Sequence, residues 1–370
     1  MKEIENRQIY FSHLDGLRCL AVCSVFIGHW ITFPFPYLNF IPFGSGGVNL
    51  FFVLSGFLIS RILLIGKGNV GNFGIKKQIK IFYIRRTLRI FPIYYFLLIV
   101  LYSLNFENVR SLFLWLFTYT LNIKFSFQNV WESKFLGAFD HLWSLSAEEQ
   151  FYLLFPIAVF LIPFHRIKSL IYALILIGLG SRFIIFYYNF PINSIYVFPT
   201  TCFDSFGVGA LLAYMYLYEK QKLLNILNNK IFFLLSICFF IVLIVYSRIQ
   251  IDGYKECRTV IERFSFSVIC FWFVGWGVFN SYTGVYKRVL EMKIIVYLGR
   301  ISYGLYIYHN FIGQIPMINQ KQIFTSSFAD NLTKACIYFS LTILISTISF
   351  FLVELPINKF KNKFNLYEKT

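Results

Sequence analysis

Long apolar stretches, separated by short polar ones, make up most of this sequence. Each stretch runs for about 15 to 20 residues, which is enough for an α-helix to cross the hydrocarbon layer of a membrane. They lie at about 14–33, 48–65, 91–105, 149–164, 169–188, 199–218, 231–247, 265–282, 294–315 and 334–353. This pattern predicts an all-α polytopic integral membrane protein with about ten transmembrane helices.

One more apolar stretch, Ser111 to Leu121, is too short to span and predicts a re-entrant or interfacial segment. The distribution of basic residues supports leaving it out of the count. With the N-terminus inside, the basic residues gather in the inner segments, and the outer segments 34–47 and 189–198 contain no Lys or Arg. Counting the short stretch as a span would move all later basic loops to the outer side of the membrane. The positive-inside rule therefore places both termini in the cytoplasm.

The composition fits a membrane protein and argues against a nucleic-acid-binding one. The chain is 58% hydrophobic and only 14% charged, whereas soluble domains contain nearer 25% charged residues. Its net charge of +17 is expected in the inner loops, because no basic run carries the aromatic pattern of an RNA-binding strand. The seven Cys form no CxxC pair, so we expect no metal site. No long polar stretch interrupts the chain, which predicts one domain over 1–370 without a removable signal peptide.

The first apolar segment carries charges that a membrane helix does not readily tolerate. Asp15 and Arg18 lie near its beginning and His29 near its end. Arg18 and His29 fall on one helix face, roughly 16 Å apart along the axis. An ionisable residue inside a bilayer is costly unless it is paired or faces a cavity, so it marks a functional site by default. The alternative is an Arg that reaches the interface and a His that bonds to a neighbouring helix.

A second group of charges precedes the third apolar segment. Arg86 and Arg89 are three residues apart and share a helix face just inside the membrane. Charged residues here can simply determine topology. Arginines near a helix start, where the helix dipole disfavours cations, instead indicate an anionic ligand.

The stretch Asp140 to Pro156 leads into the fourth apolar segment from the outer side. It places His141, Glu148 and Glu149 at about the depth of His29, and Glu148 can share a face with Tyr152. Carboxylates at a helix N-terminus can be ordinary caps. A Glu that orients a His is also what general-base chemistry on an alcohol requires.

Other charged and polar residues fall inside the later apolar segments. Arg182 and Asp204 lie at similar depth, which predicts a structural ion pair. Ser302 and His309 share a face of the ninth segment. Two more charges lie at inner ends of segments, Arg300 in the ninth and Glu354 at the end of the tenth. Glu354 is a candidate counter-ion for the inner arginines.

Five motifs in this order resemble those of the membrane acyltransferase-3 family. They are Leu14-Asp-Gly-Leu-Arg with His29, Gly47-Val-Asn-Leu-Phe-Phe-Val-Leu-Ser-Gly-Phe, Arg86-Thr-Leu-Arg, Trp143-Ser-Leu-Ser-Ala-Glu-Glu-Gln-Phe-Tyr and Gly299-Arg-Ile-Ser-Tyr-Gly-Leu-Tyr. The resemblance covers essentially the whole chain. It implies a bacterial cytoplasmic-membrane enzyme that transfers an acyl group, commonly acetyl from acetyl-CoA, to a sugar hydroxyl. Some family members carry an esterase-like SGNH domain, and this sequence contains no such domain.

The resemblance and the charges together suggest one mechanism. Acyl-CoA would enter from the cytoplasm as a substrate, with its phosphates held by Arg18, Arg86 and Arg89 and with Arg300 nearby. His29, oriented by Glu148 or alternatively by Glu149, would deprotonate the acceptor hydroxyl. An acyl-enzyme on His29 or Tyr152 is an alternative route.

The acceptor and the oligomeric state stay open at this stage. The resemblance implies an envelope carbohydrate, such as lipopolysaccharide O-antigen, an exopolysaccharide or another glycan or glycolipid. A transporter or flippase for an acyl group or a lipid-linked sugar would also line its path with Arg, His and Glu, but it would show paired broken helices in two halves. The sequence contains no such repeat. A membrane scaffold without activity would have no reason to bury Arg18 and His29.

Overall fold

The computed structural model describes residues 10–35, 38–39, 41–68, 74–128, 137–246, 255–279, 281–314 and 328–361. The secondary structure in these ranges is helical. The elements are α1 Ser12–Trp30, α2 Phe43–Gly68, α4 Ile75–Leu104, η2 Phe106–Ser111, α5 Phe113–Phe117, α6 Leu121–Ser126, η3 Gly137–Leu142, α8 Trp143–Leu161, η4 Phe164–Arg166, α9 Ile167–Tyr187, α10 Ile192–Val197, η5 Pro199–Cys202, α11 Phe203–Tyr218, α12 Lys220–Asn228, α13 Lys230–Tyr246, α14 Lys255–Val278, α15 Gly284–Glu291, α16 Lys293–Arg300, α17 Ser302–Ile312, α18 Phe328–Ser349, the π-helical turn η6 Phe350–Glu354 and α19 Leu355–Lys361.

Several of these helices match membrane spans in length and polarity. Among the described residues, five helices are long and apolar enough to cross a membrane, and the pair α12 and α13, bent by 64°, would make a sixth. The five are Phe43–Gly68, Ile75–Leu104, Phe164–Tyr187, Val260–Val278 and Phe328–Phe360. Other predicted spans correspond to shorter or more polar helices, such as α1, α8 and α11.

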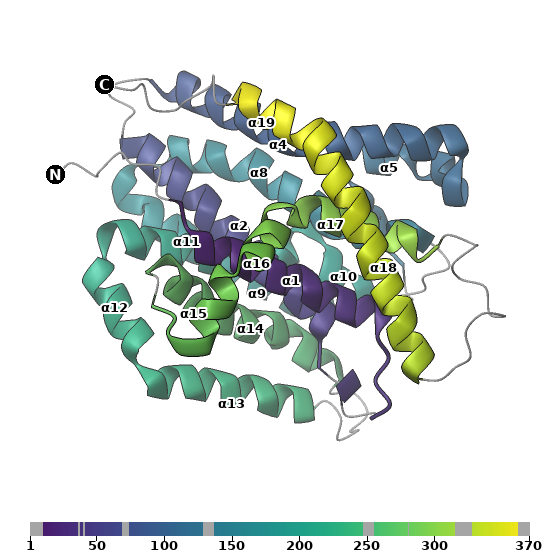
Figure 1. The fold of residues 1–370 in the computed structure, drawn as a ribbon. Helices are drawn as coiled ribbons and strands as arrows, with labels where there is room; N and C mark the ends of the chain where they lie inside the picture. The colour runs from purple at the N-terminus through teal and green to yellow at the C-terminus, as the bar shows by residue number, and fades with distance from the viewer. Residues whose placement is uncertain are drawn as a thin grey trace.

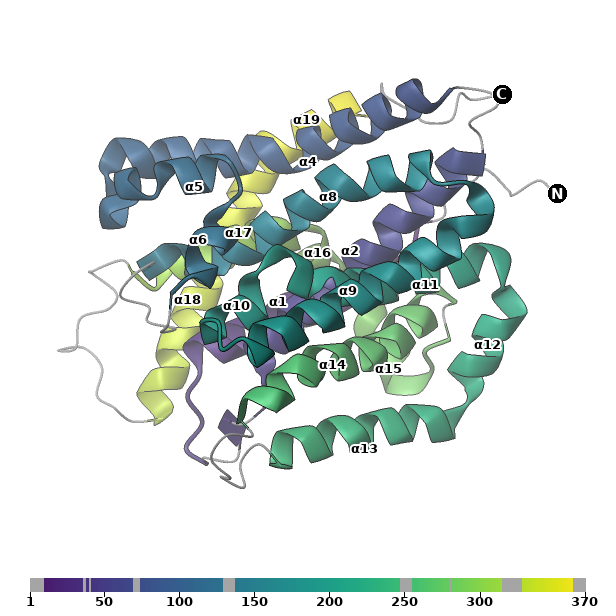
Figure 2. The same cartoon turned by 180° about the vertical axis from the view of Figure 1, so that it is seen from behind.

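The helices form a layered bundle with α2 near its centre. Figures 1 and 2 show α4 along one side and α13 along the opposite side, with α1, α2, α9, α11 and α14 between them. α2 packs most extensively against α11 and α1. The crossing of α2 and α11 brings backbone against backbone, because a Cβ atom on Gly56 would lie 2.2 Å from the Phe206 carbonyl oxygen, and one on Gly209 would lie 2.1 Å from that of Val53. Small residues of this kind allow close helix approach.

Two predicted boundaries near the site differ from the structure. α4 is continuous from Ile75, so Arg86 and Arg89 lie well inside a helix. The prediction that the helix begins near residue 91, after a basic loop, is therefore wrong. The reason is that Lys, Arg and Gln are compatible with helix although they lower the hydropathy. Neither arginine lies at a helix start, so the helix dipole does not indicate that they bind an anion. Similarly, α8 begins at Trp143, and so it contains Glu148 and Glu149.

The predicted ninth span, 294–315, is interrupted. α16 ends at Arg300 and α17 begins at Ser302, so Ile301 separates two shorter helices. The short stretch 111–121 contains only the ends of η2 and α6 and the five-residue helix α5, none of which is long enough to span.

Candidate active site

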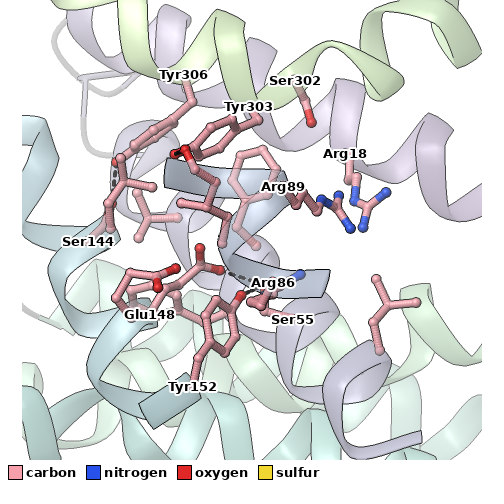
Figure 3. A pocket seen from close by; sticks show the side chains of 17 residues that line it. Arg18, Ser55, Arg86, Arg89, Ser144, Glu148, Tyr152, Ser302, Tyr303 and Tyr306 are labelled. Carbon is pink, nitrogen blue, oxygen red and sulfur yellow. Dashed lines mark hydrogen bonds between the residues drawn. The ribbon is translucent and has the colours of Figure 1, made fainter. Parts of the chain in front are cut away.

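A cavity inside the bundle collects six of the eight residues predicted to act in catalysis or to bind the donor, namely Arg18, Arg86, Arg89, Glu148, Glu149 and Tyr152. Its walls come from α1, α2, α4, α8 and α17, and its volume is about 90 Å³. The polar side chains that line it are Arg18, Ser55, Arg86, Arg89, Ser144, Glu148, Glu149, Tyr152, Ser302, Tyr303 and Tyr306. Figure 3 labels these groups except Glu149 and shows them converging from different helices. Polar groups from distant parts of the chain therefore converge in one place.

Three arginines give one side of the cavity a strong positive charge. Arg86 and Arg89 come from α4 and Arg18 from α1. Arg18 and Arg86 both lie close enough to repel Arg89 electrostatically. The Nε atom of Arg86 is buried without a hydrogen-bond partner. Guanidinium groups held together in this way match the geometry of phosphate or carboxylate oxygens.

α8 forms another wall of the cavity, next to Arg86. Ser55 on α2 donates a hydrogen bond to Oε1 of Glu148, and the Tyr152 hydroxyl donates to Ser55 Oγ at 3.0 Å. The Arg86 guanidinium stacks on the Tyr152 ring, 3.9 Å from its centroid. Glu148 and Tyr152 thus share a helix face and a common partner, Ser55.

Asp15 links the cavity to the surface. Its carboxylate accepts from Arg18 Nη1 at 2.9 Å and from the Tyr10 hydroxyl at 2.6 Å. Arg300 donates to the same Tyr10 hydroxyl at 3.0 Å, and its side chain is 55% exposed. Arg300 therefore lies outside the cavity, beside a separate surface hollow that it shares with Lys293.

The structure places His29 with two other histidines. Its Nδ1 lies 3.1 Å from Nε2 of His309, and the rings of His309 and His141 are 4.8 Å apart. The expected pairing of His29 with Glu148 or Glu149 is not formed: Glu148 bonds to Ser55. His29 also lies outside the cavity lining. The His29 ring is therefore oriented by its contact with His309 on α17.

A continuous helix face connects His29 with the cavity. A Cβ atom on Gly44 would lie 3.9 Å from His29 Nε2, so the start of α2 passes beside that nitrogen. Val48, Phe51 and Ser55 follow Gly44 at intervals of about three or four residues, on one face of α2, and all three line the cavity. His29 is therefore about one helical turn, or roughly 6 Å, beyond the end of the cavity.

The other charged residues predicted inside the apolar segments, Arg182, Asp204 and Glu354, are buried in the bundle. Arg182 and Asp204 form an ion pair in which both side chains are 0% exposed. Arg182 also donates to the carbonyls of Thr201 and Val260. Glu354 is buried in the π-helical turn, and its Oε1 has no hydrogen-bond partner.

Several site residues went unnoticed in the sequence. Ser55 joins Glu148 to Tyr152, and Tyr306 bonds to Ser144 at 2.6 Å. Tyr303 donates to the Ile90 carbonyl at 3.0 Å. Ser55, Tyr303 and Tyr306 lie within two of the five motifs, and this was the signal in the sequence that could have identified them. A motif indicates a region of the chain but not which residues are in contact.

Comparison with known proteins agrees with the site. A family model for acyltransferase-3 proteins, described as an acyltransferase domain, matches residues 11–351. The chain belongs to the acyltransferase-3 family.

Among its curated relatives, the peptidoglycan O-acetyltransferase OatA of Listeria monocytogenes is 30% identical over 95% of this chain and 56% of that protein. The O-acetyltransferase OatA of Staphylococcus aureus is 27% identical over 95% of this chain and 57% of its own length. A putative O-acetyltransferase of Staphylococcus aureus is 26% identical over 95% of this chain and 58% of its own length. The chain thus spans little more than half of these relatives. No solved structure matches it.

Proposed function

We propose that this protein is a membrane O-acetyltransferase that moves an acetyl group from acetyl-CoA to a hydroxyl of an envelope carbohydrate. The observation that carries the proposal is the convergence of Arg18, Arg86 and Arg89 on one cavity that Glu148 and Glu149 also line. Burying several charges in an apolar bundle is costly. A polyanionic substrate that enters the cavity accounts for the arginines.

In this proposal the arginines bind the donor. The guanidinium groups hold phosphate oxygens of acetyl-CoA through charge-assisted hydrogen bonds. Arg300, which is near the surface end of the Asp15 and Tyr10 chain, meets the part of the donor that stays outside the cavity. The acetyl thioester then lies along the α2 face toward Gly44.

His29 is the proposed general base. Its nitrogen takes the proton of the acceptor hydroxyl as the oxygen forms a bond to the acetyl carbon. The carbon–sulfur bond breaks, and CoA leaves as a thiolate that takes up a proton. An acyl-enzyme on His29 or Tyr152 is the other route, and it would release CoA before the acceptor binds.

The acceptor class follows from the relatives and remains a proposal. One relative is named for peptidoglycan, so a peptidoglycan-type glycan is the first acceptor to test. Lipopolysaccharide O-antigen, exopolysaccharide and other glycolipids are the further candidates. The bacterial relatives support a location in the cytoplasmic membrane, and the basic loops support about ten spans with both termini cytoplasmic.

Acetyl transfer by the full chain in lipid nanodiscs tests the proposal. Radiolabelled acetyl-CoA is supplied with peptidoglycan fragments, O-antigen or exopolysaccharide, and labelled glycan and free CoA are measured. His29→Ala should reduce transfer by about 10²–10⁴-fold while leaving acetyl-CoA binding intact. His165→Ala is the control, because His165 is exposed on η4. A purified protein that moves lipid-linked sugar but never releases CoA would be a flippase, and the proposal would be wrong.

A further inference from the structure

The hydrogen bonds of His309 determine which of its ring nitrogens carries a proton. Its side chain is 0% exposed and lies on α17. Nδ1 is 2.6 Å from the Tyr306 carbonyl oxygen, and Nε2 is 3.1 Å from His29 Nδ1. A carbonyl oxygen can only accept. Nδ1 of His309 therefore carries the hydrogen in that bond.

The surroundings of His309 hold it in the neutral form. The rings of Phe26, Trp30, Tyr306 and His141 pack around it. His141 is no counter-ion, since its own Nε2 is 3.1 Å from the Ile307 carbonyl. Among the described residues, the polar partners of His309 are thus a carbonyl and a neutral imidazole. A buried cation would need a paired anion.

A neutral His309 with a protonated Nδ1 has a bare Nε2. This nitrogen can only accept, so His29 must donate from its Nδ1 across the 3.1 Å contact. The Nε2 atom of neutral His29 is then unprotonated. It lies next to Gly44, where a Cβ atom would be 3.9 Å away, and the side chain of His29 is exposed.

We infer that His309 is a positioning residue that fixes the tautomer of His29, so that a basic Nε2 faces the acceptor hydroxyl at Gly44. The inference rests on the proposed function, in which His29 is the base. In aqueous solution the opposite tautomer, with the hydrogen on Nε2, is the more common one, and it would present a donor instead of a base. When His29 takes the acceptor proton, its bond to His309 becomes charge-assisted and therefore stronger. The proton on Nδ1 stays in place throughout, and the transferred proton resides on Nε2.

Nitrogen-15 NMR of the full chain in nanodiscs tests the tautomer directly. The protein contains five histidines, and the signals of His29 can be assigned from their loss in His29→Gln. We expect Nδ1 of His29 to be of the protonated pyrrole type and Nε2 of the bare pyridine type. In His309→Phe, which has no acceptor, His29 should move toward the opposite tautomer. Bare Nδ1 in the unsubstituted protein, or an unchanged tautomer in His309→Phe, would overturn the inference.

Kinetics separates positioning from folding. His309→Phe should lower kcat by about tenfold or more with little change in the KM for acetyl-CoA. His309→Gln keeps a carbonyl oxygen that can accept from His29, so it should lose less activity than His309→Phe and show the original tautomer. Equal losses in both variants, with His29 in its original tautomer, would make His309 a packing residue only.

Gly44→Ala tests where Nε2 points. The added methyl group would make ordinary contact with His29, 3.9 Å from Nε2. The KM for the acceptor should rise while the tautomer and the KM for acetyl-CoA stay the same. An unchanged KM for the acceptor would remove Nε2 from the acceptor path. Full transfer by His29→Ala, with the expected tautomer in the unsubstituted protein, would instead refute only the proposed role of His29.

Discussion

The central carbon of the Arg86 guanidinium lies over the ring of Tyr152, 3.9 Å from the ring centroid. Its Nε atom is buried without a hydrogen-bond partner among the described residues, so this N–H group can donate to a ligand. Tyr152 in turn bonds to Ser55, which bonds to Glu148. Arg86, Tyr152, Ser55 and Glu148 therefore form one connected group in the cavity.

Replacement of Arg86 should weaken donor binding. A charge-assisted hydrogen bond contributes about 1.5–3 kcal/mol, so Arg86→Lys and Arg86→Ala should raise the KM for acetyl-CoA by about tenfold or more. Arg86→Lys should not rescue binding, because Lys lacks the planar fork that stacks on Tyr152. Arg166→Ala, at an exposed position, is the control. A normal KM with a much lower kcat would move Arg86 from binding to catalysis or folding.

Ser55 and Ser60 form a matched pair on α2. Ser55 bonds to Glu148 and Tyr152, whereas the buried Ser60 hydroxyl has no partner. Ser55→Ala removes a hydrogen bond to a carboxylate and should lower kcat/KM by about ten- to hundredfold. Ser60→Ala should leave acetyl transfer nearly unchanged. If the two variants behave alike, the Ser55 contacts do not contribute to the reaction.

The Arg182–Asp204 pair should affect folding more than activity. Arg182→Met leaves Asp204 buried without its partner, which costs about 3–5 kcal/mol of stability. The yield of folded protein and its melting temperature in detergent should fall. Adding Asp204→Leu should recover part of the loss but not all of it, because the Arg182 bonds to the carbonyls of Thr201 and Val260 stay lost, although Arg263 still donates to Thr201. Activity per folded molecule should stay near normal, and a selective loss of activity would indicate substrate contact.

Asp140 should make stability depend on pH. It precedes α8, and burial raises its pKa from the ordinary 3.8 to about 6, although Asn310 donates to it. The folded state therefore binds this proton more tightly than the unfolded chain does. This contribution to stability is complete below about pH 4 and is lost as the pH rises to about 6. Asp140→Asn should flatten the melting temperature across that window. An unchanged slope would assign the pH dependence to other groups.

Cysteine labelling tests the proposed topology. Lys76 is exposed on the basic half of α4, and Phe190 is exposed after α9. In intact cells, a membrane-impermeant thiol reagent should label Phe190→Cys and spare Lys76→Cys. The exposed native Cys238 and Cys336 are replaced first. Labelling at Lys76→Cys alone would invert the topology and move the entrance for acetyl-CoA to the other side.

Spacing and depth were enough to bring some of these residues together. Arg18, Arg86 and Arg89 line one cavity, and Arg182 meets Asp204. Such groupings follow from position along each helix. Which neighbour a side chain contacts depends also on helix rotation and crossing, which a single sequence does not encode in its periodicity. For this reason the sequence suggested Glu148 as the partner of His29, whereas the structure pairs His29 with His309.

Hydropathy also gave the wrong helix boundaries at two places. The basic half of α4 resembled a loop because charged residues lower the mean hydropathy, although they do not prevent a helix. The ninth apolar segment gave no sign of the interruption at Ile301.

The two helices α2 and α4 both line the cavity, but they differ in how tightly they are packed. The backbone contact with α11 holds α2 rigidly in place. Gly56 and Gly209 allow no added side chain without moving a helix, and 72% of the most apolar part of α2 is buried. The corresponding part of α4 is only 28% buried, and α4 packs mainly against short segments such as α19 and η2. Substitutions that add a side chain where α2 crosses α11 should therefore change how much protein folds. Substitutions on α4 should change how readily the donor enters, so that donor range can be engineered on α4 while the rest of the bundle keeps its shape.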